Sequence, residues 1–207
     1  MTDPSPIVLS ALTLLAYLIG GLPFGYWFVR LRLGKDIRTM GSGNIGATNV
    51  HRTAGGSAGL AVLFLDIFKG FLAVYAAWLV THGNPIAVAL AAAAVVVGHC
   101  YPAFLQFRGG KAVACFIGAF GFISPVTLLL TALAFFAMLA LKRYVSLSSI
   151  TGAIVYPVLF WLIDHPPAVL LCASIFASAL VIFRHAGNIA RLRNGTEAAF
   201  SFRKKAA

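Results

Sequence analysis

Long apolar runs dominate the sequence and constrain its fold more than any other feature. Seven runs are separated by short polar segments: Ile7–Val29, Leu60–Val80, Ile86–Leu105, Ala112–Ile123, Val126–Leu141, Val145–Ile163 and Ala168–Phe183. The first, second, third and sixth reach the roughly 20 residues that a helix needs to cross a bilayer. Only 10% of all residues are charged, against about a quarter in soluble proteins. The sequence therefore predicts an all-α integral membrane protein with about seven transmembrane helices, some of them short.

Lysine and arginine residues are confined to some of the connecting segments and so indicate the topology. All but one of the 16 fall in four stretches: Arg30–Arg52, Arg108–Lys111, Lys142–Arg143 and Arg184–Lys205. With seven spans these stretches all emerge on one face, which by the positive-inside rule is cytoplasmic. We therefore expect the N-terminus outside and the C-terminus in the cytoplasm.

The fourth run, Ala112–Ile123, leaves an alternative open. It could be a half-helix, or it could fuse through Ser124 and Pro125 with the next run, which would leave six spans. Fusion would place Lys142 and Arg143 on the face opposite the basic C-terminus. Seven spans fit the positive-inside rule better.

The remaining composition narrows the class of protein. No linker, low-complexity tract or internal repeat divides residues 1–207, so we expect a single polytopic membrane domain. The three cysteines lie apart, without Cys/His metal spacing, and we expect no metal and no other cofactor. The net charge of +11 lies at the edges of apolar runs, where it suits anionic membrane lipid rather than nucleic acid.

A glycine-rich polar segment, Gly41–Asn49, lies between the first two apolar runs. Glycine backbone can turn several N–H groups toward one anion, and neighbouring hydroxyl and amide side chains add donors. The segment therefore predicts a phosphate-binding loop. Its candidate binding residues are Ser42, Gly43, Asn44, Gly46, Thr48 and Asn49.

Two further polar segments are predicted on the same face, at Gly98–Lys111 and Arg184–Glu197. Taken singly, the three segments could be a flexible connector, a positive-inside anchor and a basic tail on lipid headgroups. Together they set a group of cations against the single carboxylate of Glu197: Arg52, Arg108, Lys111, Arg184, Arg191 and Arg193. That excess of positive charge favours anionic ligands.

Asp66 and Lys69 lie inside the second run, where a charge costs about 2.5–3.5 kcal/mol on insertion scales. Their spacing of three residues lets them pair on one helix face. They either form a purely structural ion pair or help to hold the predicted cytoplasmic site in position without contacting substrate.

The three polar segments closely resemble the motifs of one enzyme family. Gly41-Ser-Gly-Asn-Ile-Gly-Ala-Thr-Asn49 is similar to the first motif, and Gly98-His-x-x-Pro with Phe-Arg-Gly-Gly-Lys111 to the second. Arg184-His-x-x-Asn-Ile-x-Arg-Leu-x-x-Gly-x-Glu197 resembles the third. The family is that of the bacterial acyl-phosphate-dependent glycerol-3-phosphate acyltransferases, and the resemblance covers nearly the whole chain.

The resemblance implies a seven-helix enzyme of the bacterial cytoplasmic (inner) membrane with its active site facing the cytoplasm. Such an enzyme transfers a fatty acyl group from acyl phosphate to the 1-hydroxyl of glycerol 3-phosphate, giving lysophosphatidic acid in the first acylation of phospholipid synthesis. An enzyme that makes acyl phosphate would supply the donor, in transient contact. Because acyl phosphate carries a good leaving group, positioning and charge neutralisation can supply most of the rate without an acyl-enzyme.

The motif match and the loop chemistry together predict the roles of individual residues. The catalytic group comprises Ser42, Arg52, Lys111, His185 and Asn188, with Arg52 and Lys111 neutralising the two phosphates. Besides the loop residues above, substrate binding is expected at His99, Arg108, Gly109, Gly110, Arg191 and Glu197. The general base is either a histidine or a phosphate oxygen of the substrate, and His99 could instead be structural.

A membrane transporter of a small anion or phosphorylated solute is the alternative. It would also combine small residues with intramembrane charge, but its polar residues should recur near midplane in symmetric halves. In this sequence they crowd one face instead. For the acyl chain of the enzyme's substrate we expect a lateral groove that opens to the membrane.

Overall fold

The computed structural model describes residues 4–200, and within that part every regular element is helical. The α-helices are α1 (Pro6–Gly20), α2 (Phe24–Leu33), α3 (Ala47–Ala54), α4 (Gly56–Val80), α5 (Pro85–Cys100), α6 (Val113–Ile123), α7 (Pro125–Lys142), α8 (Val145–Asp164), α9 (Ala168–Arg184) and α10 (Ala186–Arg193). Short 3-10 turns, η1 (Ile37–Thr39) and η2 (Ala103–Leu105), lie in the connections. The prediction of an all-α membrane protein is confirmed.

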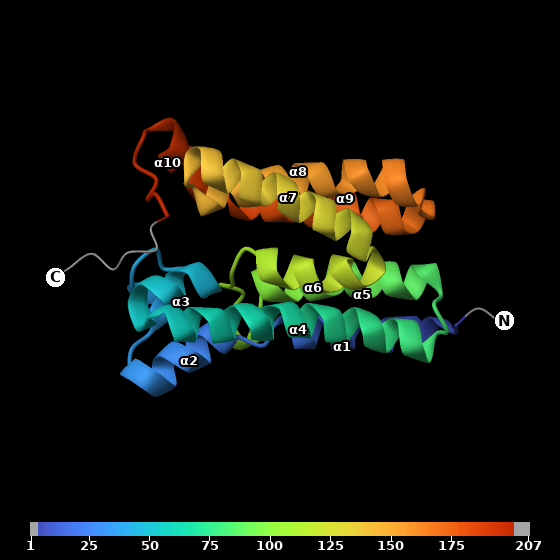
Figure 1. The fold of residues 1–207 in the computed structure, drawn as a ribbon. Helices are drawn as coiled ribbons and strands as arrows, with labels where there is room; N and C mark the ends of the chain where they lie inside the picture. Colours follow the sequence, from blue (N-terminus) through green and yellow to red (C-terminus); the bar gives the residue numbers. More distant parts are fainter. Residues whose placement is uncertain (1–3, 201–207) are drawn as a thin grey trace.

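The helices form two layers, α1, α4, α5 and α6 in one and α7, α8 and α9 in the other (Figure 1). Contacts of α5 with α9 and of α6 with α7 join the layers. The core between them contains buried Phe120 and Tyr156, whose hydroxyl donates to the Phe120 carbonyl at 3.0 Å. Small residues allow the closest approaches, since a side chain at Gly118 would overlap the Ile67 backbone.

All seven predicted runs are helical, but they differ in length. Five segments are long and apolar enough to cross a membrane, and the pair α9 and α10, bent by 53°, makes up to six. Helix α6 has 11 residues and is only about 16 Å long at 1.5 Å per residue, too short to span alone. The first run is interrupted at residues 21–23, because Pro23 cannot continue α1.

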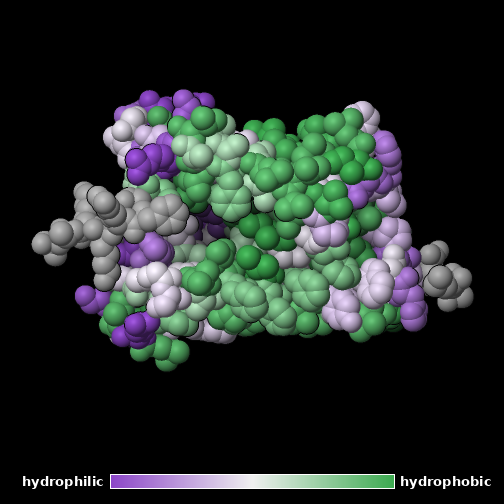
Figure 2. All heavy atoms as spheres, viewed as in Figure 1, coloured by the Kyte–Doolittle hydropathy of each residue, from purple (hydrophilic) through white to green (hydrophobic). Residues whose placement is uncertain are grey.

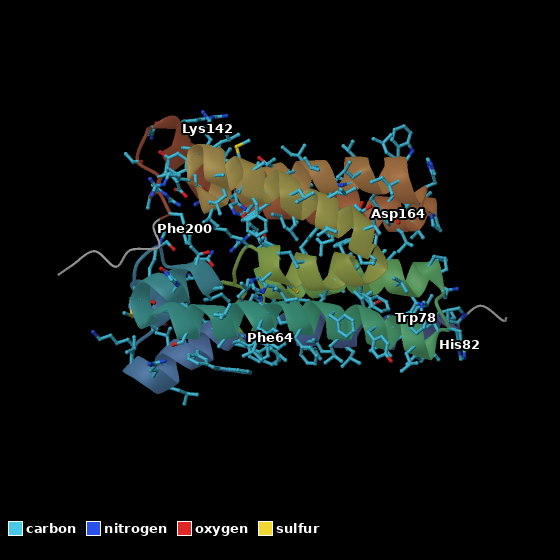
Figure 3. All side chains as sticks on the ribbon, in the orientation of Figure 1. Phe64, Trp78, His82, Lys142, Asp164 and Phe200 are labelled. Carbon is cyan, nitrogen blue, oxygen red and sulfur yellow. The ribbon has the colours of Figure 1, made fainter. Side chains whose placement is uncertain are left out.

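The surface has an apolar middle and polar ends (Figure 2). Helices α2, α3 and α10 gather at one end, which we call the polar-loop end, while the α4–α5 and α8–α9 connections lie at the other (Figure 1). Lys142 lies at the polar-loop end, and Asp164 and His82 lie at the opposite end (Figure 3). Helix α6 ends at Ile123 and α7 begins at Pro125, so the two are separate helices that turn at Ser124. The fused run considered above does not form.

Candidate active site

The glycine-rich loop, residues 41–49, is shaped chiefly by Asn49 at the start of α3. The buried Asn49 amide donates to the carbonyls of Met40 and Asn44, at 3.0 and 2.8 Å. Its oxygen accepts the N–H of Ser42 at 3.0 Å. Since both ends of this side chain are engaged within the loop, Asn49 holds the loop's shape and is not positioned to bind phosphate directly.

Some of the predicted backbone donors are also engaged inside the loop. The N–H of Gly43 donates to Met40, and that of Gly46 to the Asn44 side chain at 2.8 Å. The first N–H groups of α3, at Ala47 and Thr48, have no such partner among residues 4–200. This helix terminus, next to the exposed Ser42 and Thr48 side chains, is the part of the loop open to an anion.

The second polar loop folds back onto the end of α5. The N–H groups of Gly109 and Gly110 donate to the carbonyls of Cys100 and His99, at 3.2 and 3.0 Å. A side chain at Gly109 would overlap the His99 carbonyl, and one at Gly110 would overlap the His99 ring. Both glycines are thus required by close packing, and their N–H groups are not free for substrate.

Arg184, the last residue of α9, fixes the other side of this loop. Its guanidinium donates to the carbonyls of Gly110 and Gly109, at 3.0 and 2.9 Å, and lies over the Tyr101 ring. The planar fork of arginine suits two adjacent acceptors. Because Lys111 follows directly, Arg184 determines where the Lys111 side chain starts.

A chain of hydrogen bonds connects Lys111 to the third polar segment. Lys111 donates to the amide oxygen of Asn188, and the Asn188 amide nitrogen donates to Glu197 at 2.6 Å. Ser146 donates to the same Glu197 oxygen at 2.6 Å, and Arg191 donates to the other at 2.7 Å. Glu197 therefore orients Asn188 and Arg191, and its carboxylate is stabilised by one ion pair and two neutral hydrogen-bond donors.

These contacts shift the pKa of both ionised ends of the network. Burial raises the pKa of Glu197, but the hydrogen bonds from Ser146, Asn188 and Arg191 outweigh it and hold the pKa below its usual value. Burial, with the positive charges of Arg191, Arg52 and Arg184, lowers the pKa of Lys111 to about 8. Four cations therefore act on one small volume.

His185 lies at the bend between α9 and α10 and is buried, at 2% exposure. Its Nδ1 lies 2.8 Å from the Val181 carbonyl. A carbonyl only accepts, so Nδ1 carries the proton and Nε2 of the neutral ring is an acceptor. No hydrogen bond occupies Nε2 among the described residues, which leaves it available to a hydroxyl group.

The structure brings together most of the predicted catalytic residues. Lys111, Asn188 and His185 form one group, within electrostatic reach of Arg52. Arg108 is exposed and takes no part in this group. His99, at 4% exposure, lies beneath Gly110 and packs against the loop, so the expected substrate contact at His99 stays a prediction.

The sequence-based list of site residues omitted Arg184 and Ser146. Arg184 belongs to the third motif and to the group of cations, so the sequence did indicate that it could lie at the site. Ser146 had none, because its partner Glu197 is 51 positions away and lies in the segment that follows α10, whose position the local sequence does not indicate. Among the described residues no group of three His, Cys, Asp or Glu side chains could hold a metal ion.

Comparison with known proteins identifies the family to which the chain is similar. Residues 10–195 match the family Glycerol-3-phosphate acyltransferase. A glycerol-3-phosphate acyltransferase of Syntrophotalea carbinolica is 47% identical over 90% of this chain and 95% of its own, and one of Staphylococcus aureus strain JH9 is 42% identical over 92% and 97%.

Two solved structures have the same fold. They are crystal structures of PlsY (YgiH), an integral membrane glycerol 3-phosphate acyltransferase, in glycerol 3-phosphate and lysophosphatidic acid forms. The first has a TM-score of 0.88, 39% identity and coverage of 93% of this chain and 96% of its own. The second has a TM-score of 0.85, 37% identity and coverage of 93% and 95%. The chain belongs to the glycerol-3-phosphate acyltransferase family.

Proposed function

We propose that this glycerol-3-phosphate acyltransferase takes its acyl group from a fatty acyl phosphate and transfers it to the 1-hydroxyl of glycerol 3-phosphate. The products are lysophosphatidic acid and inorganic phosphate. The family assignment favours acyl transfer over the transporter considered from the sequence. The choice of donor goes further than the family assignment and rests on the site itself.

One observation carries the choice of donor: the site has positive charge for two phosphates. The positive charges of Arg52, Arg184 and Arg191 act on the half-buried Lys111, while the carboxylate of Glu197 accepts hydrogen bonds on both oxygens. A second anion-binding position is the open N-terminus of α3. We assign Lys111 to glycerol 3-phosphate, and the loop at α3 with Arg52 to the acyl phosphate.

The proposed reaction is a direct displacement. The 1-hydroxyl oxygen attacks the acyl carbonyl carbon, the bond between that carbon and the phosphate oxygen breaks, and phosphate leaves with the bonding electrons. The hydroxyl proton passes to His185 Nε2 or to an oxygen of the leaving phosphate. Ser42 and Asn188 orient the glycerol, and the cations stabilise the negative charge that develops on the phosphate.

The acyl chain needs an apolar surface that reaches this polar end. A groove of about 510 Å³ lies between α4, α6 and α7, with Phe64, Phe68 and Phe71 on one wall and Gly118 and Gly121 in its floor. Helix α6, which forms the floor, begins two residues after Lys111. Figure 2 shows the surface hollowed where the two layers meet. We infer that the chain of the donor lies in this groove.

We also propose that residues 1–207 form one polytopic domain in the bacterial cytoplasmic membrane, with the N-terminus outside and the site facing the cytoplasm. The concentration of Lys and Arg at the polar-loop end supports this orientation. Single cysteines placed at Lys35 and Gly83 in intact cells should give opposite accessibility to an impermeant thiol reagent. Equal labelling of the two positions would refute the orientation.

The test of function is product formation by the purified protein in lipid nanodiscs. Parallel reactions contain glycerol 3-phosphate with palmitoyl phosphate, palmitoyl-CoA or palmitoyl acyl carrier protein. Lysophosphatidic acid from palmitoyl phosphate alone would support the proposal, and product only from a thioester would overturn the choice of donor. The same protein incubated with the enzyme that makes acyl phosphate would show whether direct contact between them raises the rate.

A matched pair of lysine variants tests the role of the site. Lys111→Met should abolish most of the turnover, because an uncharged side chain cannot neutralise phosphate. Lys142→Met removes an exposed lysine at the same end of the molecule and should leave turnover unchanged. Equal losses in both variants would show that general surface charge, and not the site, governs activity.

A further inference from the structure

The break between α1 and α2 is held from inside the membrane-spanning region by a charged side chain. Lys69 of α4, at 3% exposure, donates to the carbonyl of Leu22 within the break, at 2.8 Å. Its ammonium also pairs with Asp66 at 2.7 Å and lies 5.5 Å from the centre of the Phe24 ring. A carbonyl freed by a helix break needs such a donor, because lipid supplies none.

The position of α2 in turn sets the position of the glycine-rich loop. Gly25, in the first turn of α2, lies so close to the Ile45 carbonyl that a side chain there would overlap it. Val29 of α2 packs with Ile45 and Val50 in a small buried cluster on the same side. Ile45 lies within the loop, so any shift of α2 must move the loop.

The same ion pair lies beside the support of the second polar loop. His99 Nδ1 is 3.8 Å from the Asp66 carboxylate, and the His99 ring packs against Gly110. No hydrogen bond reaches His99 Nδ1 within residues 4–200. Asp66 and Lys69 are therefore buried beneath both loops.

We propose that Lys69, paired with Asp66, is a positioning residue for acyl transfer. Lys69 fixes the α1–α2 break through Leu22, and the contact between Gly25 and Ile45 passes that position on to the loop at the start of α3. The inference rests on the proposed function, in which this loop holds the acyl phosphate. A purely structural ion pair would contribute to stability without selecting one substrate.

The kinetic consequence is specific to the donor. Loss of the Leu22 contact should lower kcat/KM for acyl phosphate by up to about a hundredfold, since a misplacement of an ångström can cost that much. Because the displaced loop binds the donor, the loss should appear as a higher KM for acyl phosphate. KM for glycerol 3-phosphate should change little, because Lys111 is held separately by Arg184 and Asn188. A simple loss of folded protein would lower the apparent kcat and leave both KM values unchanged.

The variants remove the contact without leaving an unpaired buried charge. Asp66→Asn combined with Lys69→Met deletes both charges and the donor to Leu22, whereas Lys69→Arg keeps charge and donor and should retain a low KM for acyl phosphate. The thermal midpoint of each variant is measured beside its kinetics. Turnover of the wild-type enzyme with palmitoyl phosphate is measured first. If the wild type does not use this donor, the proposed function fails independently of the variants.

A second variant tests the same route without touching the ion pair. Gly25→Ala should push α2 from Ile45 and raise KM for acyl phosphate in the same way. Gly152→Ala is the matched control, because its side chain would meet only Thr131 at an ordinary 3.5 Å. An unchanged KM for acyl phosphate in folded Gly25→Ala, or in the folded double variant, would overturn the proposal even if the other variant cannot be purified.

Discussion

Lys111 and Asn188 are joined by a hydrogen bond across 77 positions of sequence, and the bond connects the two layers of helices at the site. Lysine offers only donors, so the Asn188 oxygen must face Lys111 and its nitrogen must face Glu197. The orientation of the amide is thus fixed from both sides. The directions of the hydrogen bonds around Lys111 are therefore fixed before a substrate phosphate binds.

Removal of Glu197 should release this network. In Glu197→Ala, Asn188, Ser146 and Arg191 lose their common acceptor, and we expect kcat/KM for glycerol 3-phosphate to fall by about a hundredfold. Glu197→Gln keeps an oxygen for Asn188 and should lose less. Steady-state kinetics of both variants in nanodiscs would show this order, and equal activity of wild type and Glu197→Ala would contradict it.

The lowered pKa of Lys111 predicts a pH dependence. Below a pH of about 8 the free enzyme carries the Lys111 cation, and above it the neutral amine prevails, so the affinity for phosphate is lost as pH rises. The substrate phosphate is already ionised there, with a second pKa near 6. KM for glycerol 3-phosphate should therefore rise above pH 8 by about tenfold per pH unit.

Lys111→Arg provides the control for this pH dependence. Arginine stays charged across the whole range, so its KM should be flat between pH 7 and pH 10 even if it is higher overall. A rise of the same shape in Lys111→Arg would assign the pH dependence to another group.

The sequence predicted the membrane-spanning architecture well, because an apolar run of sufficient length has few alternatives to a helix in a bilayer. It did not reveal the break at residues 21–23, since Leu22 keeps the run apolar and only Pro23 signals an interruption. It also left open whether Ala112–Ile123 forms a separate helix or fuses with the next apolar run. Ser124 and Pro125 are a local signal for a helix start, because Ser124 accepts the N–H of Thr127 and proline suits the first position of α7. This signal alone does not decide between a kinked span and two separate helices, which depends on the packing of α6 against α4.

The sequence predicted which residues lie together at the candidate site better than it predicted what each residue does there. The motif segments contain Lys111, Asn188 and His185, which the structure brings together. Asn49 and Glu197 look like ligands in sequence because they are polar, yet their atoms are bonded to other parts of the protein. Which polar atom remains free depends on partners that are distant in sequence.

Arg184 should be as important as the residues that it positions. Arg184→Met removes both hydrogen bonds to the Gly109 and Gly110 carbonyls, each worth about 1.5–3 kcal/mol as a charged bond. Displacement of Lys111 should then lower kcat/KM by about a hundredfold. Arg193→Met, which removes an exposed arginine of α10, should keep near-wild-type kinetics. Equal kinetics in the two variants would remove Arg184 from the site.

At the end of the molecule away from the site, Asp164 links α8 to the start of α7. Ser124 and Thr127 both donate to the Asp164 carboxylate, at 2.8 and 2.5 Å. Asp164→Ala removes the acceptor of both hydrogen bonds and should lower stability by about 1–3 kcal/mol, seen as a lower thermal midpoint, while KM values stay unchanged. Asp36→Asn disrupts a partly exposed pair with Arg38 and should cost less than about 1 kcal/mol. A larger effect at Asp36 would contradict the assignment.

The groove between α4, α6 and α7 should discriminate acyl chains by shape. Leu128 lines it, and Leu128→Trp would fill its end near the α6–α7 turn. Because the groove and the bilayer are both apolar, the variant changes the affinity for the acyl chain only by steric exclusion. Overpacking of this kind costs about 1–3 kcal/mol, which corresponds to about tenfold or more in affinity. KM for palmitoyl phosphate should rise more than KM for octanoyl phosphate, and KM for glycerol 3-phosphate should stay constant. Leu133→Trp, on the exposed face of α7, should change none of them. If Leu128→Trp raises both donor KM values equally, the chain lies elsewhere.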